Sequence, residues 1–274
     1  MTTMREPISA PAQATASWLT EALRSSGHLD RGEVTAVKCS DPAKTFTSNI
    51  AHLQLSYSSQ TPPTAPERLF LKVSAQTTAP GSFGGDHFQR EALFYQEVAG
   101  AMPSPPSIRC YDVAYSAETS RCHLLLDDIA SSHGQSEHPL PPTDEQCKQG
   151  IMCLARFHAF WWQHPRIGVD IGRFRTPEER QTGVSETQEM IQAFVRFLGD
   201  SISTERRQIY AAVSAALPHL AERRSESRNL TLIHGDAHLW NFMFPHSDVD
   251  PTYIIDWQFW NPSVGTTDLA FMIA

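Results

Sequence analysis

The 274-residue sequence lacks the features that mark membrane proteins and nucleic-acid-binding proteins. No stretch approaches the roughly eighteen consecutive apolar residues of a membrane-spanning helix, and the first residues contain no apolar run typical of a secretion signal. Lys and Arg total 22 against 30 for Asp and Glu, so the basic excess needed to contact many phosphates is also missing. We therefore expect a soluble, cytoplasmic protein that binds neither membranes nor nucleic acids.

Cysteine is scarce and irregularly placed. The five cysteines are an odd number and form no Cys-x-x-Cys pair, which argues against a disulfide framework and against a cysteine zinc site. Internal repeats and low-complexity tracts are absent as well. The remaining composition, 41% hydrophobic and 19% charged, is that of an ordinary packed protein, and the length suits two modest lobes.

The first half of the sequence alternates between strand-like and helical patterns. Residues 10–27 have helical spacing. Period-two alternation or short apolar runs then predict five strands, at residues 32–39, 49–57, 68–74, 109–116 and 122–129. A helix at residues 87–99 falls between the third and fourth of these strands. This order predicts a small antiparallel sheet with one helix packed on it.

A polar segment rich in proline and serine, "ASSHGQSEHPLPPT", follows the last of these strands. It predicts a boundary between a first lobe, residues 1–129, and a second lobe, residues 130–274, with a hinge at residues 127–130. Helical spacing in the second lobe predicts helices that begin after Thr143 or span residues 185–199 and 205–224. Short strands are expected at residues 230–233, 242–244 and 253–255. The expected fold class is α+β, with a mainly helical second lobe.

The segment "TLIHGDAHLWNFMF" breaks an apolar strand pattern with polar residues. Asp236 follows a short strand and a glycine, so we expect its carboxylate in a loop that faces a ligand. Asn241, five residues later, offers an amide oxygen suited to magnesium. Asp256 ends the apolar strand of "YIIDWQ", where a carboxylate is costly unless it binds a cation or hydrogen-bond donors. Phosphoryl transfer needs such groups, together with a lysine on the phosphates.

The first lobe supplies a lysine of this kind. In "RLFLKVS", Lys72 points to the face of the strand opposite Leu69, Leu71 and Val73. A lysine in the middle of a strand needs a partner, and Glu91 in "FQREALFYQEVA" offers one on the following helix. Such a pair would hold the ammonium on nucleotide phosphates, as the lysine and helix glutamate of kinases do.

Together these segments resemble the aminoglycoside phosphotransferase and choline kinase group of the protein-kinase-like fold, and most closely its ecdysteroid-kinase-like members. The resemblance rests on "LFLKVS", "REALFYQ", "LLLDDI", "LARFHAFWW", "HGDAHLWN" and "IIDWQ", in the expected order across nearly the whole chain. It implies a bilobal protein-kinase-like fold and transfer of the γ-phosphate of ATP, with magnesium, to a hydroxyl group of a small molecule.

The resemblance also implies roles for single residues. Asp236 would be the catalytic base, Asn241 and Asp256 would hold magnesium, and Lys72 and Glu91 would position the phosphates. Adenine would bind the backbone at Asp127, Asp128 and Ile129. A small-molecule acceptor is favoured over a protein because Gly235 stands where protein kinases usually carry arginine and because residues 163–229 form a helical insertion. The acceptor pocket is expected in that insertion, and aminoglycosides, choline-like amines, sterols and sugars all remain open as acceptors, as does ATP against GTP.

The sequence departs from the family pattern in three places. The phosphate-covering loop, expected at residues 43–49, reads "AKTFTSN" and has no glycine, so contact with phosphates would rely on Thr45, Thr47, Ser48 and Asn49. Family members continue for several helices after "TTDLAFM", so we expect part of the acceptor pocket to be missing if the chain is a truncated form. Gln258 replaces the glycine of the protein-kinase Asp-Phe-Gly triplet.

Two other hypotheses remain open, the first motivated by the glycine-free loop and the early end of the chain, and the second by the histidine and aspartate cluster of "HGDAH". One is a kinase-fold protein that binds a nucleotide or metabolite but catalyses poorly. The other is a metal-dependent phosphohydrolase, in which His238 of "HGDAH" would be a metal ligand. We interpret His234 and His158 as structural histidines within the core. The tryptophans near these motifs are more typical of core packing than of an aromatic cage for the acceptor.

Overall fold

The computed structural model describes residues 6–45, 47–75, 85–137, 141–223, 228–247 and 249–273. Two compact units make up the chain. The first comprises Met1–Phe160, His234–Trp260 and Thr266–Ala274, and the second Trp161–Ile233 and Asn261–Gly265. The predicted lobes, 1–129 and 130–274, were divided at the hinge segment instead, and that division stays a prediction.

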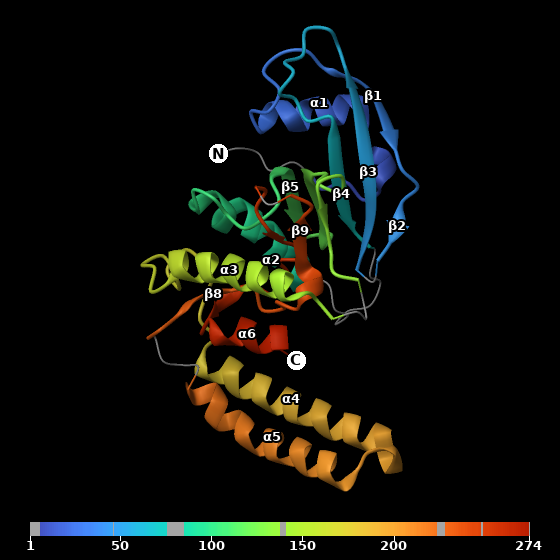
Figure 1. The fold of residues 1–274 in the computed structure, drawn as a ribbon. Coiled ribbons are helices and arrows are strands. Elements are labelled where there is room, and N and C mark those ends of the chain that lie inside the picture. The colour runs from blue at the N-terminus through green and yellow to red at the C-terminus, as the bar shows by residue number, and fades with distance from the viewer. Residues whose placement is uncertain are drawn as a thin grey trace. The chain divides into compact units, whose positions relative to one another are not determined.

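The main sheet of the first unit is antiparallel, with strand order β1-β3-β4-β6-β5 and β2 paired to β3 beside that path (Figure 1). Its strands are β1 (Val34–Cys39), β2 (Ala43–Lys44), β3 (Ser48–Tyr57), β4 (Arg68–Ser74), β5 (Cys110–Ser116) and β6 (Arg121–Asp127). The predicted antiparallel sheet is therefore confirmed, with the short strand β2 in addition.

Helices cover both faces of this sheet. Helix α1 (Ala16–Ser25) buries Leu19 and Leu23 in one cluster with Leu53, Leu71 and Leu125 of the strands. Helix α2 (Gly85–Leu93), continued by the π-helical turn η2 (Phe94–Val98) and by η3 (Ala99–Ala101), packs on the opposite face, where Cys122 meets the helix. Because neighbouring residues of a strand point to opposite faces, the same strands can pack against α1 on one face and against α2 on the other. The prediction of a single packed helix was thus incomplete, because the helix predicted at residues 10–27 covers the second face.

The remainder of the first unit consists of short strands and two helices. Strands β7 (His133–Gly134), β9 (Phe242–Pro245) and β10 (Tyr253–Ile254) form a small sheet in the order β10-β9-β7, and η5 (Leu239–Asn241) precedes β9. Helices α3 (Asp144–Trp161) and α6 (Thr266–Ile273) complete it. Trp257 is fully buried and stacks on Phe94, with ring centroids 3.8 Å apart and planes at 7°.

The second unit contains a helical hairpin and a two-stranded sheet. Helices α4 (Pro177–Leu198) and α5 (Thr204–Arg223) lie side by side (Figure 1), and β8 (Thr231–Ile233) pairs antiparallel with β11 (Asn261–Ser263). The prediction that the first of these helices begins at residue 185 was wrong. Helix α4 starts eight residues earlier, at Pro177, because Thr176 and Glu179 form a capping box and proline is favoured in the first turn.

The tryptophans divide between the interior and the surface. Trp161, Trp257 and Trp260 are buried, whereas Trp162 and Trp240 are 51% and 39% exposed. The expectation of core packing therefore holds for three of these five. Within the described ranges, no helix combines the length and the apolar character needed to cross a membrane.

The alternation along β3 gives a test of the sheet. Leu53 is 1% exposed in the cluster beneath α1, whereas Gln54 is exposed. We expect Leu53→Ala to lower the free energy of unfolding by about 2–5 kcal/mol, because a buried leucine is lost and a cavity remains. Gln54→Ala, the matched control, should change it by less than about 0.5 kcal/mol. Urea unfolding followed by circular dichroism measures both, and equal effects would contradict this register.

Candidate active site

The loop that carries Asp236 is held in place by a buried carboxylate of α6. Asp268 lies in the first turn of α6 and is fully buried. Its Oδ2 accepts hydrogen bonds from the backbone N–H of His234 at 2.8 Å and from His158 Nε2 at 2.9 Å, and its Oδ1 accepts from the N–H of Gly235 at 2.8 Å. Three donors compensate a charge that is costly to bury. The backbone just before Asp236 is thereby fixed.

The His234 side chain connects this loop to the segment that carries Asp256, one of the two predicted metal ligands. The backbone N–H of Asp236 donates to His234 Nδ1 at 3.3 Å, so Nε2 carries the proton and donates to the carbonyl of Ile255 at 2.9 Å. Burial lowers the pKa of His234, which keeps the ring neutral as this pattern requires. His234 is fully buried, and its ring lies in a T-shaped contact with that of Trp257. Its role is structural.

Gly235 is required by the shape of the loop. Its φ of 84° lies in the left-handed region, and a Cβ atom at this position would lie 2.4 Å from the carbonyl oxygen of Phe259. Any other residue would be strained by conformation and by contact with backbone. This is a physical reason for the glycine that precedes Asp236.

The structure brings Asp236 and Asn241 together. Asn241 Nδ2 donates to the backbone carbonyl of Asp236 at 2.9 Å and lies 3.3 Å from its Oδ2. The carbonyl of Asn241 accepts from the N–H of Ile255 at 2.9 Å. His238 Nε2 lies 3.5 Å from Asp236 Oδ2 and 3.3 Å from Asn241 Nδ2, while its buried Nδ1 has no hydrogen-bond partner among the described residues. These contacts direct the Asn241 amide nitrogen to Asp236 and leave Oδ1 for a ligand.

Lys72 contacts two carboxylates. Its Nζ donates to Glu91 Oε1 at 2.9 Å and also to Asp256 Oδ1, which is 184 residues away in the sequence. The Lys72 and Glu91 side chains are 12% and 3% exposed, while that of Asp256 is 46% exposed. Gln258 Nε2 donates to the same Oδ1 of Asp256 at 3.1 Å. The predicted lysine–glutamate pair is therefore present and extends to the predicted metal ligand.

The pKa values of this cluster follow from burial and charge. Burial alone would lower the pKa of Lys72, but Glu91 and Asp256 outweigh it and raise that pKa above its usual value. Burial would raise the pKa of Asp256, but the Lys72 ammonium outweighs it and lowers that pKa. Both groups are thus charged near neutral pH. Burial raises the pKa of Glu91, whose Oε2 has no hydrogen-bond partner among the described residues.

The side chain of Asp128 holds the predicted hinge in place by hydrogen bonds. Its Oδ1 accepts from the N–H of Ala130 at 3.1 Å, and its Oδ2 accepts from His52 Nδ1 at 2.9 Å and from Arg68 Nη2 at 3.2 Å. Burial alone would raise the pKa of Asp128, but these donors outweigh it and lower that pKa. The carboxylate therefore fixes the turn that follows β6.

The backbone of the hinge is partly engaged already. The N–H of Asp127 donates to the backbone carbonyl of Arg109 at 2.9 Å, and the N–H of Asp128 donates to the backbone carbonyl of Arg68 at 3.4 Å. This leaves the N–H of Ile129 as the candidate donor to a base among the three predicted positions.

The described residues of the predicted phosphate loop, between β2 and β3, bond to one another. Thr45 and Ser48 bond reciprocally, from Thr45 N–H to the Ser48 carbonyl at 2.8 Å and from Ser48 N–H to Thr45 Oγ1 at 2.9 Å. Ser48 is buried, with its hydroxyl 3.4 Å from that of Thr47. Asn49 lies within the β3 ladder, and Phe46 lies outside the described residues. The Thr45 side chain thus links the end of β2 to the start of β3.

The side chains present fit a magnesium ion. Asn241 has its Oδ1 available, and Asp256 offers Oδ2 while Oδ1 is held by Lys72 and Gln258. One carboxylate and one amide oxygen suit Mg²⁺, which commonly takes few protein ligands and completes its shell with water and phosphate oxygens. Among the described residues, no group of three or more His, Cys, Asp or Glu side chains is arranged to hold a metal, so the hydrolase hypothesis gains no support.

Two positions of the site escape sequence reasoning. Asp268 reads as an ordinary first-turn aspartate, a position that the helix dipole favours in any case. Gln258 reads only as a departure from the protein-kinase triplet. A first-turn aspartate is common in helices of any kind, so the sequence gives no signal that separates Asp268 from an ordinary helix-dipole residue.

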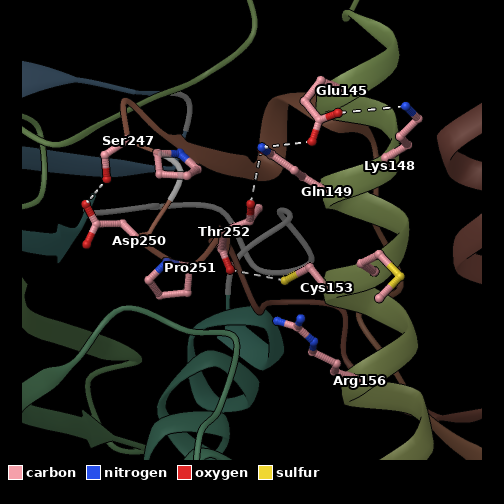
Figure 2. Close-up of a pocket in the computed structure, with 11 residues that line it drawn as sticks. Glu145, Lys148, Gln149, Cys153, Arg156, Ser247, Asp250, Pro251 and Thr252 are labelled. Carbon is pink, nitrogen blue, oxygen red and sulfur yellow. Dashed lines mark hydrogen bonds and ion pairs between the residues drawn. The ribbon is translucent and has the colours of Figure 1, made fainter.

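A pocket of about 290 Å³ lies away from these residues, between α3 and the segment after β9 (Figure 2). Its polar groups pair mostly with one another, as in the hydrogen bonds from Ser247 to Asp250 at 2.6 Å and from Cys153 Sγ to the Thr252 carbonyl at 3.2 Å. None of the predicted site residues lines it. We assign it no part in the chemistry of the site.

Two similar solved structures are aminoglycoside phosphotransferases. A 3′-phosphotransferase of type VIII aligns with a TM-score of 0.52 at 16% identity, covering 86% of this chain and 77% of that chain. The GDP complex of a 2′-phosphotransferase IIIa variant aligns with a TM-score of 0.50 at 13% identity, covering 94% of this chain and 76% of that chain. At such identities the likeness concerns the fold, and the predicted protein-kinase-like fold is confirmed.

No curated protein sequence matches the chain significantly. The sequence profile of the ecdysteroid kinase-like family, in contrast, matches residues 42–274, which is far more than half of the chain. This chain therefore belongs to the ecdysteroid kinase-like family.

Proposed function

We propose that this protein transfers the γ-phosphate of ATP to a hydroxyl group of a small molecule, with magnesium. The observation that carries the proposal is the contact of Lys72 with both Glu91 and Asp256. A lysine between a helix glutamate and a strand-end aspartate is the arrangement that phosphoryl transfer uses to position phosphates beside a metal ligand. Membership in a kinase-like family supports the same reaction class.

The nucleotide would be bound by groups of the first unit. The Lys72 ammonium would hold the phosphates, and the segment at Thr47, Ser48 and Asn49 would lie over them, with Thr47 as the residue whose hydroxyl is not enclosed. The backbone at Asp127, Asp128 and Ile129 would take the base, with Ile129 as N–H donor. One of the similar structures is a GDP complex, so both purine nucleotides belong in any test.

Asp236 would act as the base. Its side chain is 30% exposed, and the Asn241 amide lies beside its Oδ2, so Oδ1 is the oxygen that would accept the proton of the acceptor hydroxyl. The hydroxyl oxygen would then form a bond to the γ-phosphorus while the bond to the β-phosphate oxygen breaks and ADP leaves. Asn241 and Asp256 would hold the magnesium, whose charge neutralises the phosphates.

The acceptor site would lie in the helical insertion, residues 163–229. Similar proteins bear the name aminoglycoside phosphotransferase, and the family takes its name from ecdysteroid kinases. Hydroxylated ring compounds of both kinds, with amino sugars and choline-like amines beside them, form the first panel to screen.

A second candidate function is nucleotide or metabolite binding with little turnover. The segment at residues 43–49 favours it, because the segment has no glycine and Ser48 is buried rather than open to phosphates. The two candidates differ in a single measurement, which is ADP release in the presence of an acceptor.

Replacing the base gives the first test of the proposal. Asp236→Asn should reduce turnover by about 10²–10⁴, the usual contribution of a general base, because the amide cannot accept the hydroxyl proton. Nucleotide affinity should stay near that of the wild type, since Asp236 does not face the phosphates in the proposed arrangement. Steady-state ADP release with an acceptor from the panel measures the first quantity, and equilibrium nucleotide binding the second.

Asp250→Asn is the matched control for this change, because Asp250 is an exposed aspartate of the β9–β10 segment that pairs with Ser247. Its turnover should equal that of the wild type. Undiminished turnover of Asp236→Asn would refute the assignment of the base.

Nucleotide binding gives the second test. ATP with magnesium should raise the melting temperature of the wild type, since a ligand at a hundred times its Kd stabilises by about 2.7 kcal/mol. Asp256→Asn should lose the magnesium-dependent part of this shift, because a carboxylate ligand is replaced by an amide. Thermal unfolding with ATP or GTP, with and without magnesium, measures the effect.

Asp250→Asn again serves as the control and should keep the full shift. No shift of the wild type with either nucleotide would remove the basis for the proposed function. If Asp256→Asn keeps the full magnesium-dependent shift, Asp256 is not the metal ligand.

A further inference from the structure

The predicted metal ligand Asp256 is already occupied by a cation of the protein itself. The Lys72 ammonium reaches Asp256 Oδ1 while it also donates to Glu91 at 2.9 Å. Gln258 Nε2 donates to the same Oδ1 at 3.1 Å. The oxygen with two donors is held firmly, and Oδ2 is the oxygen left for any further ligand.

Solvent reaches this cluster from one side. Lys72 and Glu91 are almost enclosed, whereas nearly half of the Asp256 side chain is exposed. A cation that arrives from solvent therefore meets Asp256 first, and immediately behind it the ammonium. Like charges repel strongly where protein rather than water lies between them.

The negative charge offered to such a cation is small. Of the two predicted metal ligands, Asn241 is neutral, so Asp256 supplies the only formal charge. Lys72 lies directly behind that charge and offsets part of it, although its ammonium is shared with Glu91. Mg²⁺ gives up its water reluctantly and needs strong charge to do so. The side chains are thus well placed for a metal but electrostatically weak while Lys72 stays on Asp256.

We propose that Lys72 keeps free divalent cations off Asp256 until a nucleotide is bound. The inference rests on the proposed function, because nucleotide phosphates are the anions that would draw the ammonium from Asp256. Metal and nucleotide then bind with positive coupling: each raises the affinity of the other by the same factor. The metal alone binds poorly, and Lys72 has a role in the order of binding beside its role on the phosphates.

The test is a titration with Mn²⁺, followed by the electron paramagnetic resonance signal of the free ion, with and without a non-hydrolysable ATP analogue. In the wild type, the analogue should raise Mn²⁺ affinity strongly. Lys72→Met and the polar Lys72→Gln should bind Mn²⁺ at least tenfold more tightly than the wild type without nucleotide. The gain produced by the analogue should shrink accordingly. A damaged fold would weaken Mn²⁺ binding, so the expected change has the opposite sign from simple disruption.

Three further variants locate the effect. Lys72→Arg keeps the positive charge and should bind Mn²⁺ as weakly as the wild type without nucleotide. Lys38→Met removes an exposed lysine of β1 in the same sheet and should change nothing. Adding Asp256→Asn to Lys72→Gln should abolish the tenfold gain, because the released carboxylate is then absent.

The outcomes separate this inference from the proposed function. If the wild type binds no Mn²⁺ even with the analogue, the proposed metal site fails and the inference fails with it. If the wild type binds Mn²⁺ with the analogue but the neutral Lys72 variants show no gain without it, only the inference is overturned. A gain that Lys38→Met reproduces would also overturn it, because the cause would then be overall charge.

Discussion

The buried carboxylate of Asp268 is the contact on which the geometry of the candidate active site depends. It holds the backbone N–H groups just before Asp236, the proposed base, and from there the connections continue through the His234 side chain and the main chain. His234 donates to the carbonyl of Ile255, and the N–H of Ile255 donates to the carbonyl of Asn241. Because every link ends on a backbone atom of this loop or of the Asp256 segment, the main chain around Asp236, Asn241 and Asp256 is held by two buried side chains, Asp268 and His234.

Aromatic packing supplies the second constraint. Trp257 follows the predicted metal ligand Asp256 directly and stacks on Phe94, which follows the helix that carries Glu91. Trp260 adds a hydrogen bond to the carbonyl of Arg90 at 2.7 Å. This packing holds the Asp256 segment against the end of α2 and keeps water from the lysine–glutamate pair. Burying an ion pair carries a desolvation penalty, which the attraction between the charges offsets only while the geometry is maintained.

Much of the site could be predicted because each of its charged residues is anomalous in its own segment. Lys72 interrupts an apolar strand and Asp256 ends one, so each requires a partner of opposite charge, and the structure pairs them with each other and pairs Lys72 with Glu91 as well. The sheet could be predicted for the same reason, since period-two alternation is a property of each strand alone. The proximity of Asp236 and Asn241 follows from a spacing of five residues across one short turn.

The rest could not be predicted because its evidence lies in distant segments. Asp268 is unremarkable in α6, and only the N–H groups of a loop more than thirty residues away show its purpose. Helix α1 was recognised as a helix, yet the face of the sheet that it covers is a property of the assembled strands. A polar residue in an apolar segment can be recognised from the sequence as one that needs a partner. The partner often lies in a segment where polar residues are common, and there it cannot be recognised. The sequence thus identifies the residue of a buried polar contact that lies in an apolar segment, and the fold is needed to identify its partner.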